Sequence, residues 1–266
     1  MNNPICVCID RNPFQTVDEL VEQIATVGLA GPEWFEMGPE EIWSNRDVAS
    51  RLHNLTRRLN LTPQYHAPYT DPFDIAREAG KARSPESLRR LVGRLMDNAE
   101  RLGCSLITVH LGNQPADMDR PDALSNVLEG LLATVPDLER RRMRLALENH
   151  TAAIIEHPLG DRPEEFDWLM EEISSPAVGR TFDPAHAHIN GHLDEFLARP
   201  FDRVFNIHLH DNHGEKDEHL PIGGGTLPWD RVFARLGDEC YRGALTLEYF
   251  APAEAYRQSI ERIRSA

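Results

Sequence analysis

The chain has 266 residues, a net charge of −15 at pH 7, 41% hydrophobic residues and 27% charged residues. This composition is ordinary for a globular protein, whereas the negative charge disfavours nucleic acid as a partner and favours a small-molecule substrate. The sequence starts without the basic region and apolar run of a signal peptide, and no segment approaches the roughly 18 apolar residues of a membrane span. We therefore expect a cytoplasmic protein with no membrane partner.

Short apolar runs alternate with amphipathic segments along the whole chain. The apolar runs predict strands at residues 4–9, 33–37, 62–66, 105–110, 142–148, 179–183, 203–210 and 244–248. Helices are predicted at residues 16–28, 39–60, 84–102, 121–140 with an interruption at Pro136, 163–173, 193–198, 228–240 and 252–264. Two of them have clear start signals: Thr16-Val-Asp-Glu19 is a capping box, and Ser84-Pro85 is an N-cap followed by proline.

This alternation predicts one (β/α)8 TIM barrel of the α/β class, with residues 1–266 as a single domain. A doubly wound sheet is the main rival. It would carry a phosphate-binding glycine turn after its first strand, but Ile9-Asp-Arg-Asn-Pro13 contains no glycine. The cysteines show no disulfide framework, so we expect all four to be reduced core residues: Cys6, Cys8, Cys104 and Cys240.

Six predicted strands end in an ionisable side chain after an otherwise apolar run, as in Leu106-Ile-Thr-Val-His110. The six residues are His66, His110, Glu148, Asp183, His208 and Glu248. In a TIM barrel the carboxyl ends of all strands form the active face, so these side chains should converge on one cavity. His186, in Asp183-Pro-Ala-His186, and the pair in Asp217-Glu-His219 are placed to reach the same cavity from loops.

Five imidazoles and four carboxylates in one pocket do not stabilise one another without cations, because the carboxylates repel and neutral imidazoles gain little from each other. A divalent metal resolves this. Mixed nitrogen and oxygen ligands favour zinc or manganese over calcium, with cobalt, iron and magnesium as further candidates.

Other polar residues in these loops have weaker signals. His210 shares a face with His208 and could exchange roles with it, while His213 and Lys216 contact either substrate or solvent. The glycines of Gly223-Gly-Gly225 follow a loop and not a strand, so a flexible turn explains them as well as a phosphate site does. Four further histidines are expected to be solvated loop residues: His150, His157, His188 and His192.

Taken together, these motifs resemble the xylose isomerase-like barrel superfamily, which holds sugar and sugar-phosphate isomerases and epimerases together with endonuclease IV. The resemblance covers nearly the whole chain. It is carried by His66-Ala-Pro-Tyr, Thr-Val-His110, Leu-Glu148-Asn, Phe-Asp183-Pro-Ala-His186, His208-Leu-His-Asp, Asp217-Glu-His219-Leu-Pro-Ile-Gly and Leu-Glu248.

The isomerase and epimerase branch implies one metal ion, held by Glu148, Asp183, His208 and Glu248, that grips two adjacent sugar oxygens. Removal of a carbon-bound proton would then give a stabilised enediolate, with both glutamates as proton-transfer partners and His186 on substrate oxygens. We predict a metal-dependent isomerase or epimerase of carbohydrate metabolism. Whether it forms a homo-oligomer stays open.

The endonuclease IV branch implies instead three zinc ions and nine ligands, and this sequence has a match for each ligand. A multinuclear zinc phosphoesterase is therefore the alternative, and a ligand-binding barrel without turnover is a third reading. Against the phosphoesterase, Tyr69 is followed by Thr70-Asp71-Pro72 where an apolar wedge is expected, and the acidic loop at residues 37–43 would repel a phosphate backbone.

Overall fold

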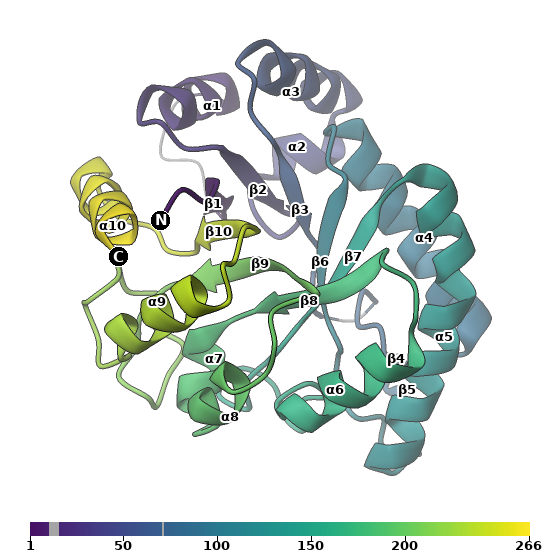
Figure 1. Ribbon diagram of the computed structural model, residues 1–266. Helices are drawn as coiled ribbons and strands as arrows, with labels where there is room; N and C mark the ends of the chain where they lie inside the picture. Colours follow the sequence, from purple (N-terminus) through teal and green to yellow (C-terminus); the bar gives the residue numbers. More distant parts are fainter. Residues whose placement is uncertain (11–15, 71) are drawn as a thin grey trace.

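The structure is a computed structural model that describes residues 1–10, 16–70 and 72–266. Eight parallel strands close into a barrel in the order β1-β10-β9-β8-β7-β6-β3-β2 (Figure 1). Their bounds are β1 Ile5–Ile9, β2 Gly31–Phe35, β3 Gln64–His66, β6 Leu106–His110, β7 Arg144–Glu148, β8 Val178–Phe182, β9 Val204–Leu209 and β10 Ala244–Leu247. The predicted TIM barrel is confirmed, while the glycine-free segment that spoke against a doubly wound sheet lies partly outside the described residues.

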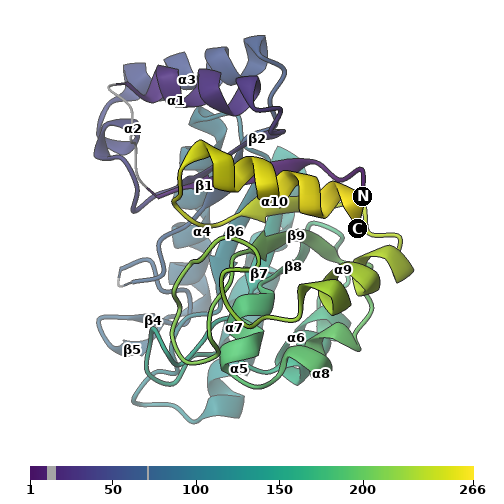
Figure 2. The same ribbon diagram turned by 90° about the vertical axis from the view of Figure 1, so that its left-hand side faces the viewer.

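Helices surround the barrel on its outside (Figures 1 and 2). Their bounds are α1 Val17–Thr26, α2 Glu40–Ser44, α3 Arg46–Arg58, α4 Pro85–Arg101, α5 Arg120–Arg141, α6 Pro163–Glu172, α7 Pro184–Ile189, α8 Leu193–Leu197, α9 Trp229–Asp238 and α10 Ala253–Ser265. The two ends of the chain lie side by side at α10, where the amino group of Met1 donates to the carbonyl of Arg264 at 3.0 Å.

Local sequence explains where the helices begin. The hydroxyl of Thr16 accepts from the Glu19 amide at 3.2 Å, and the Glu19 carboxylate accepts from the Thr16 amide at 3.2 Å, so the predicted capping box is confirmed. At α4 the Ser84 hydroxyl accepts from the Ser87 amide at 3.2 Å, with Pro85 in the first turn. The predicted N-cap with proline is therefore also confirmed.

Some predicted elements were wrong in detail. The helix expected at residues 39–60 is divided at Asn45, whose backbone is extended and whose side chain caps α3. The interruption expected at Pro136 is absent, because this proline lies on the exposed side of α5, where water can reach the carbonyl that loses its partner. Cys240 is exposed and not a core residue, since it follows α9 in a left-handed conformation (φ 50°).

Two short elements were not among the predicted ones. A two-stranded antiparallel sheet, β4 (Arg77–Glu78) and β5 (Lys81–Ala82), lies in the loop after β3. The other is α7, which begins one residue after Asp183; that carboxylate accepts from the amides of Ala185 and His186 at 2.7 and 2.9 Å.

The barrel interior is polar one layer below the carboxyl ends of the strands. The Thr108 and Thr181 hydroxyls are 3.0 Å apart, and the Thr246 hydroxyl donates to the Asn206 side chain at 2.8 Å. All four residues are fully or almost fully buried and precede the strand-end residues by two positions. The strands therefore point polar side chains inward and pack their apolar side chains against the helices.

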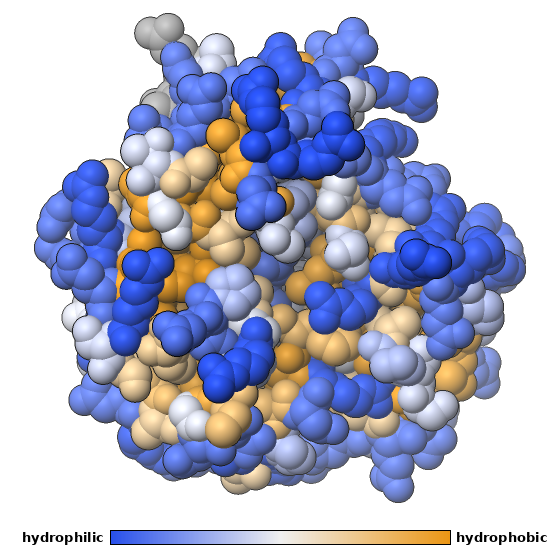
Figure 3. All heavy atoms as spheres, turned by 45° about the horizontal axis from the view of Figure 1, so that its top comes forward, coloured by the Kyte–Doolittle hydropathy of each residue, from blue (hydrophilic) through white to orange (hydrophobic). Residues whose placement is uncertain are grey.

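Figure 3 shows a largely hydrophilic face, with hydrophobic residues gathered on its left side. An apolar cavity of about 380 Å³ lies between β1, α1 and α10, and its lining includes Leu20, Ile24 and Tyr256. None of the helices in the described ranges has both the length and the apolar content that a membrane crossing requires.

The close approach of β2 to the chain before β3 gives a test of the fold. A Cβ added at Gly31 would lie 2.3 Å from the Thr62 carbonyl oxygen, whereas one added at Gly93 in α4 would meet no atom within 4 Å. We expect Gly31→Ala to lower the free energy of unfolding by about 1–3 kcal/mol. Gly93→Ala should raise it by up to about 1 kcal/mol. Urea unfolding of both variants measures this, and equal effects would contradict the described packing.

Candidate metal centre

The carboxyl ends of six barrel strands present ionisable side chains at one mouth of the barrel. In chain order they are His66, His110, Glu148, Asp183, His208 and Glu248. Strands β3, β6 and β7 end at such a residue, and β8 and β10 are directly followed by one. In β9 the ionisable residue is the last but one of the strand. Because the strands run parallel around a closed barrel, these side chains face one another.

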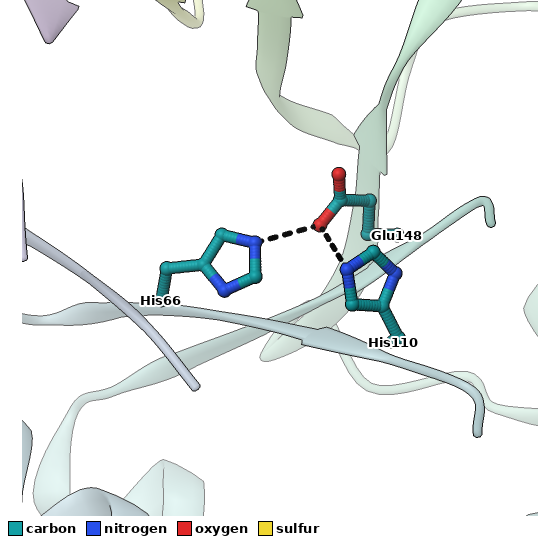
Figure 4. Close-up of side chains that lie close together, drawn as sticks. All are labelled: His66, His110 and Glu148. Carbon is teal, nitrogen blue, oxygen red and sulfur yellow. Dashed lines mark ion pairs between the residues drawn. The ribbon is translucent and has the colours of Figure 1, made fainter. Parts of the chain in front are cut away.

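The first group, called here the His66 cluster, consists of His66, His110 and Glu148 (Figure 4). The Nε2 atoms of His66 and His110 lie 3.0 and 3.3 Å from the same carboxylate oxygen, Oε2 of Glu148. The other nitrogen of His66 lies 2.8 Å from the carbonyl oxygen of Ala67. Both imidazoles therefore point one nitrogen at a single buried oxygen.

The second group, called here the Asp183 cluster, consists of Glu148, Asp183, His208 and Glu248, whose ligand atoms lie within 4.8 Å of one another. His208 Nδ1 is 2.8 Å from Glu148 Oε1 and 3.0 Å from Glu248 Oε2. Glu148 belongs to both clusters, with one oxygen directed to each. It therefore joins them into one continuous arrangement.

Three residues form a third group, called here the loop cluster: His186, Asp217 and His219. The Nε2 atoms of His186 and His219 lie 3.7 and 2.7 Å from Asp217 Oδ2. His210 connects this group to the Asp183 cluster, since its Nε2 is 2.9 Å from Asp183 Oδ2 and its ring stacks on His219 with 4.1 Å between centroids. The structure thus brings all nine predicted ligands to one mouth, together with His210.

The loop that carries Asp217 and His219 is held by a buried carboxylate. Asp211 accepts from the indole of Trp229 at 2.9 Å and from the backbone amides of Gly223 and Leu227 at 2.9 and 3.1 Å. These bonds close the segment from Asp211 to Trp229 into a fixed loop. The glycines at residues 223–225 lie inside it, which supports their interpretation as a structural turn.

Several buried atoms of the clusters lack partners. His186 Nε2, His210 Nδ1 and Asp217 Oδ1 have no hydrogen bond within residues 1–10, 16–70 and 72–266. Leaving such atoms unpaired costs about 1–3 kcal/mol each.

The spacing of the ligand atoms also fits a metal ion. Two ligands of a tetrahedral ion are about 3.4 Å apart. The shortest contacts in the His66 and Asp183 clusters, 2.8–3.3 Å, are close to that spacing. The donors fit a divalent cation.

Imidazoles set the protonation of the two glutamates. Burial works to raise the pKa of Glu148, but His110 and His208 outweigh it and hold this pKa well below its ordinary value. At Glu248 burial is likewise outweighed by His208 and His219, so that its pKa is lowered.

Burial disfavours the charged form of His219, yet its contacts with Asp217 and Glu248 raise its pKa to about 10. Metal binding must displace this proton and should therefore strengthen as the pH rises.

A cavity of about 370 Å³ opens over the clusters. Aromatic side chains form part of its wall, among them Phe35, Tyr69 and Tyr249, and carboxylates form another part. No lysine or arginine lines it within the part of the chain that the structure describes. This volume suits a small molecule, and the wall favours a neutral polar ligand that aromatic faces can cover.

Two residues predicted as substrate contacts are not among the described residues that line this cavity. His213 is exposed and places Nδ1 2.8 Å from Glu218 Oε2, and Lys216 is exposed as well. Neither contributes to the cavity wall formed by the described residues. Their contact with substrate stays a prediction, and so does that of the buried His210.

His150 was wrongly expected to be solvated. Its side chain is fully buried, lines the cavity and stacks on His110 with 4.0 Å between ring centroids. Neither ring nitrogen has a hydrogen-bond partner among the described residues. The spacing Glu148-Asn-His150 held a signal, because alternate residues share a face when the strand direction continues past its last hydrogen bond.

The sequence of the xylose isomerase-like TIM barrel family matches this chain over residues 21–266. The chain therefore belongs to this family. Its buried clusters of histidine, glutamate and aspartate are consistent with a divalent-metal site.

The chain is similar in sequence to two proteins and in fold to a solved structure. An uncharacterised protein of Methanocaldococcus jannaschii is 27% identical over 208 residues, which are 74% of this chain and 67% of that protein. A probable endonuclease 4 of Thermoplasma acidophilum is 28% identical over 146 residues, 50% of this chain and 48% of that protein. The crystal structure of a D-tagatose 3-epimerase-like protein has a TM-score of 0.80 at 24% identity and covers 98% of this chain and 96% of that chain. The similarity to the D-tagatose 3-epimerase-like protein shows that the two chains share a fold.

Glu148 offers a direct test of metal binding. Zinc or manganese at a hundred times its dissociation constant should raise the free energy of unfolding by about 2.7 kcal/mol. We expect Glu148→Gln to lose most of this gain, because the amide removes the charge that both clusters share. Thermal unfolding with metal or chelator measures the effect. Glu156→Gln, on an exposed loop residue, is the control; an equal metal response in both variants would contradict the assignment.

Proposed function

We propose that the protein is a divalent-metal-dependent isomerase or epimerase of a sugar or sugar phosphate. The main support for this proposal is the Asp183 cluster, in which three buried residues and the partly buried Glu248 stand at the ends of four strands with their ligand atoms within 4.8 Å of one another, and Glu248 also lines the cavity. A bound divalent cation would supply Lewis acidity to two neighbouring substrate oxygens. Membership of the family and the size of the cavity add support.

Glu148 and Glu248 would transfer the proton. Both reach His208 Nδ1, at 2.8 and 3.0 Å, from strands on either side of β9. Their lowered pKa values keep them as carboxylates at neutral pH, which is the form that accepts a carbon-bound proton. One glutamate, as the carboxylate, would remove the carbon-bound proton, and the other, after taking up a proton from solvent, would deliver it to the substrate, which would invert or relocate the hydroxyl-bearing centre; the first glutamate would then release its proton to solvent. His186 would contact a substrate oxygen.

Exchange of substrate hydrogen with solvent tests this role. A panel of ketoses and their phosphates is incubated with metal-loaded protein in deuterated water, and deuterium in the sugar is followed by mass spectrometry. Glu148→Gln and Glu248→Gln should each slow exchange at least about 100-fold. Glu156→Gln should exchange like wild type. Full exchange in both glutamate variants would contradict the assignment of acid and base.

His150 would be a substrate contact in this reaction, because its side chain lines the cavity and neither ring nitrogen has a hydrogen-bond partner among the described residues. His150→Phe keeps a ring for stacking on His110 but removes both nitrogens. We expect the KM for the sugar to rise by roughly 2–15-fold, the equivalent of one hydrogen bond, with unchanged metal content. His157→Asn, an exposed position in the same loop, is the control. An unchanged KM would show that His150 does not contact substrate.

A multinuclear zinc phosphoesterase is the second candidate. It is favoured by the His66 cluster and the loop cluster, which one-metal sugar chemistry does not need. The acidic cavity wall and the net charge of −15 work against a phosphodiester substrate. Metal content separates the two: one tightly bound ion supports the isomerase, whereas three zinc ions and hydrolysis of bis(p-nitrophenyl) phosphate support the phosphoesterase.

A further inference from the structure

A carboxylate inside the barrel, not recognised in the sequence, touches the histidine of the Asp183 cluster. Glu33 lies in the middle of β2, and its side chain is fully buried. In register it neighbours Cys8 of β1 and Gln64 of β3. It therefore points into the barrel below the metal-binding layer and does not line the cavity.

Each oxygen of Glu33 faces one side chain of β9. Oε2 accepts from the Asn206 side-chain amide at 2.9 Å, and the oxygen of that amide accepts from the Thr246 hydroxyl at 2.8 Å. Oε1 lies 2.9 Å from His208 Nε2, close enough for an ion pair although the two atoms are not aligned as a hydrogen bond, and neither atom has a hydrogen-bond partner in the described ranges. The orientation of Asn206 thus fixes the carboxylate opposite His208.

No lysine or arginine forms an ion pair with Glu33 in the part of the chain described by the structure. His208 Nε2 lies near enough to Oε1 to offer it a proton. The other nitrogen of this ring, Nδ1, faces Glu148 and Glu248. An imidazole in this position can bind a cation through Nδ1 while it donates from Nε2 to Glu33.

We propose that Glu33 is a positioning residue that holds His208 as the Nε2-protonated tautomer and aims Nδ1 into the Asp183 cluster. Carboxylates behind a ligating histidine commonly fix its tautomer and increase its basicity, and their loss weakens metal binding about 10- to 100-fold. The inference rests on the metal part of the proposed function and not on the identity of the substrate.

The test is metal affinity, measured by competition with a chromophoric chelator for zinc and for manganese. Glu33→Gln retains the shape of the side chain, but its amide has an oxygen at only one of the two positions, so either Asn206 or His208 loses its acceptor. We expect its dissociation constant for metal to rise about 10- to 100-fold. Glu36→Gln is the matched control, because Glu36 is three residues further along and its carboxylate accepts from Asn98 and Tyr65, neither of which belongs to the clusters.

A second measurement uses the wild-type protein and so does not depend on how the variant folds. ¹⁵N-histidine NMR of the zinc-loaded protein, with His208 assigned by comparison with His208→Asn, reports which ring nitrogen holds the proton. The inference expects a proton on Nε2 and zinc on Nδ1. Zinc on Nε2, wild-type affinity in folded Glu33→Gln, or absence of metal binding by the wild type would each overturn it. Metal binding without any sugar activity would contradict the proposed function alone.

Discussion

The contact between Glu148 and three imidazoles is the interaction on which the site depends. One oxygen of this buried carboxylate faces His66 and His110, and the other faces His208. A buried carboxylate is costly without compensating charge, and no lysine or arginine pairs with Glu148 within the described chain. The imidazoles supply this compensation, and a divalent cation held between them would add to it. A cation that satisfies Glu148 therefore acts on both clusters at once.

The barrel supplies this arrangement because its closure brings together residues that are distant in sequence. Glu33 and His208 meet across the interior, and the polar layer around Asn206 and Thr246 supports the metal-binding layer above it. Asp211 in turn fixes the loop that carries Asp217 and His219. Rigid strands thus hold the Asp183 cluster, while a loop fixed by hydrogen bonds adds further donors. The acidic and aromatic wall of the cavity then favours a small polar substrate over a polyanion.

The amino-acid sequence predicted the barrel and most strand ends because each strand is an apolar run that stops at an ionisable residue, and parallel strands bring such ends together. It did not reveal Glu33, since the contact with His208 depends on the register across the closed barrel, which no local pattern encodes. It misjudged His150 because a histidine after a strand end looks solvated until the neighbouring loops cover it. Pro136 and Asn45 show the same limit for helices: whether such a residue ends a helix depends on which side faces water.

Anomalous diffraction from crystals soaked with zinc or manganese would show whether Glu148 binds a metal ion. We expect a strong anomalous peak within about 2.0–2.2 Å of a carboxylate oxygen of Glu148. Asp183, His208 Nδ1 and Glu248 should complete the coordination of that ion. Peaks confined to surface pairs such as His213 and Glu218, with none beside Glu148, would contradict it.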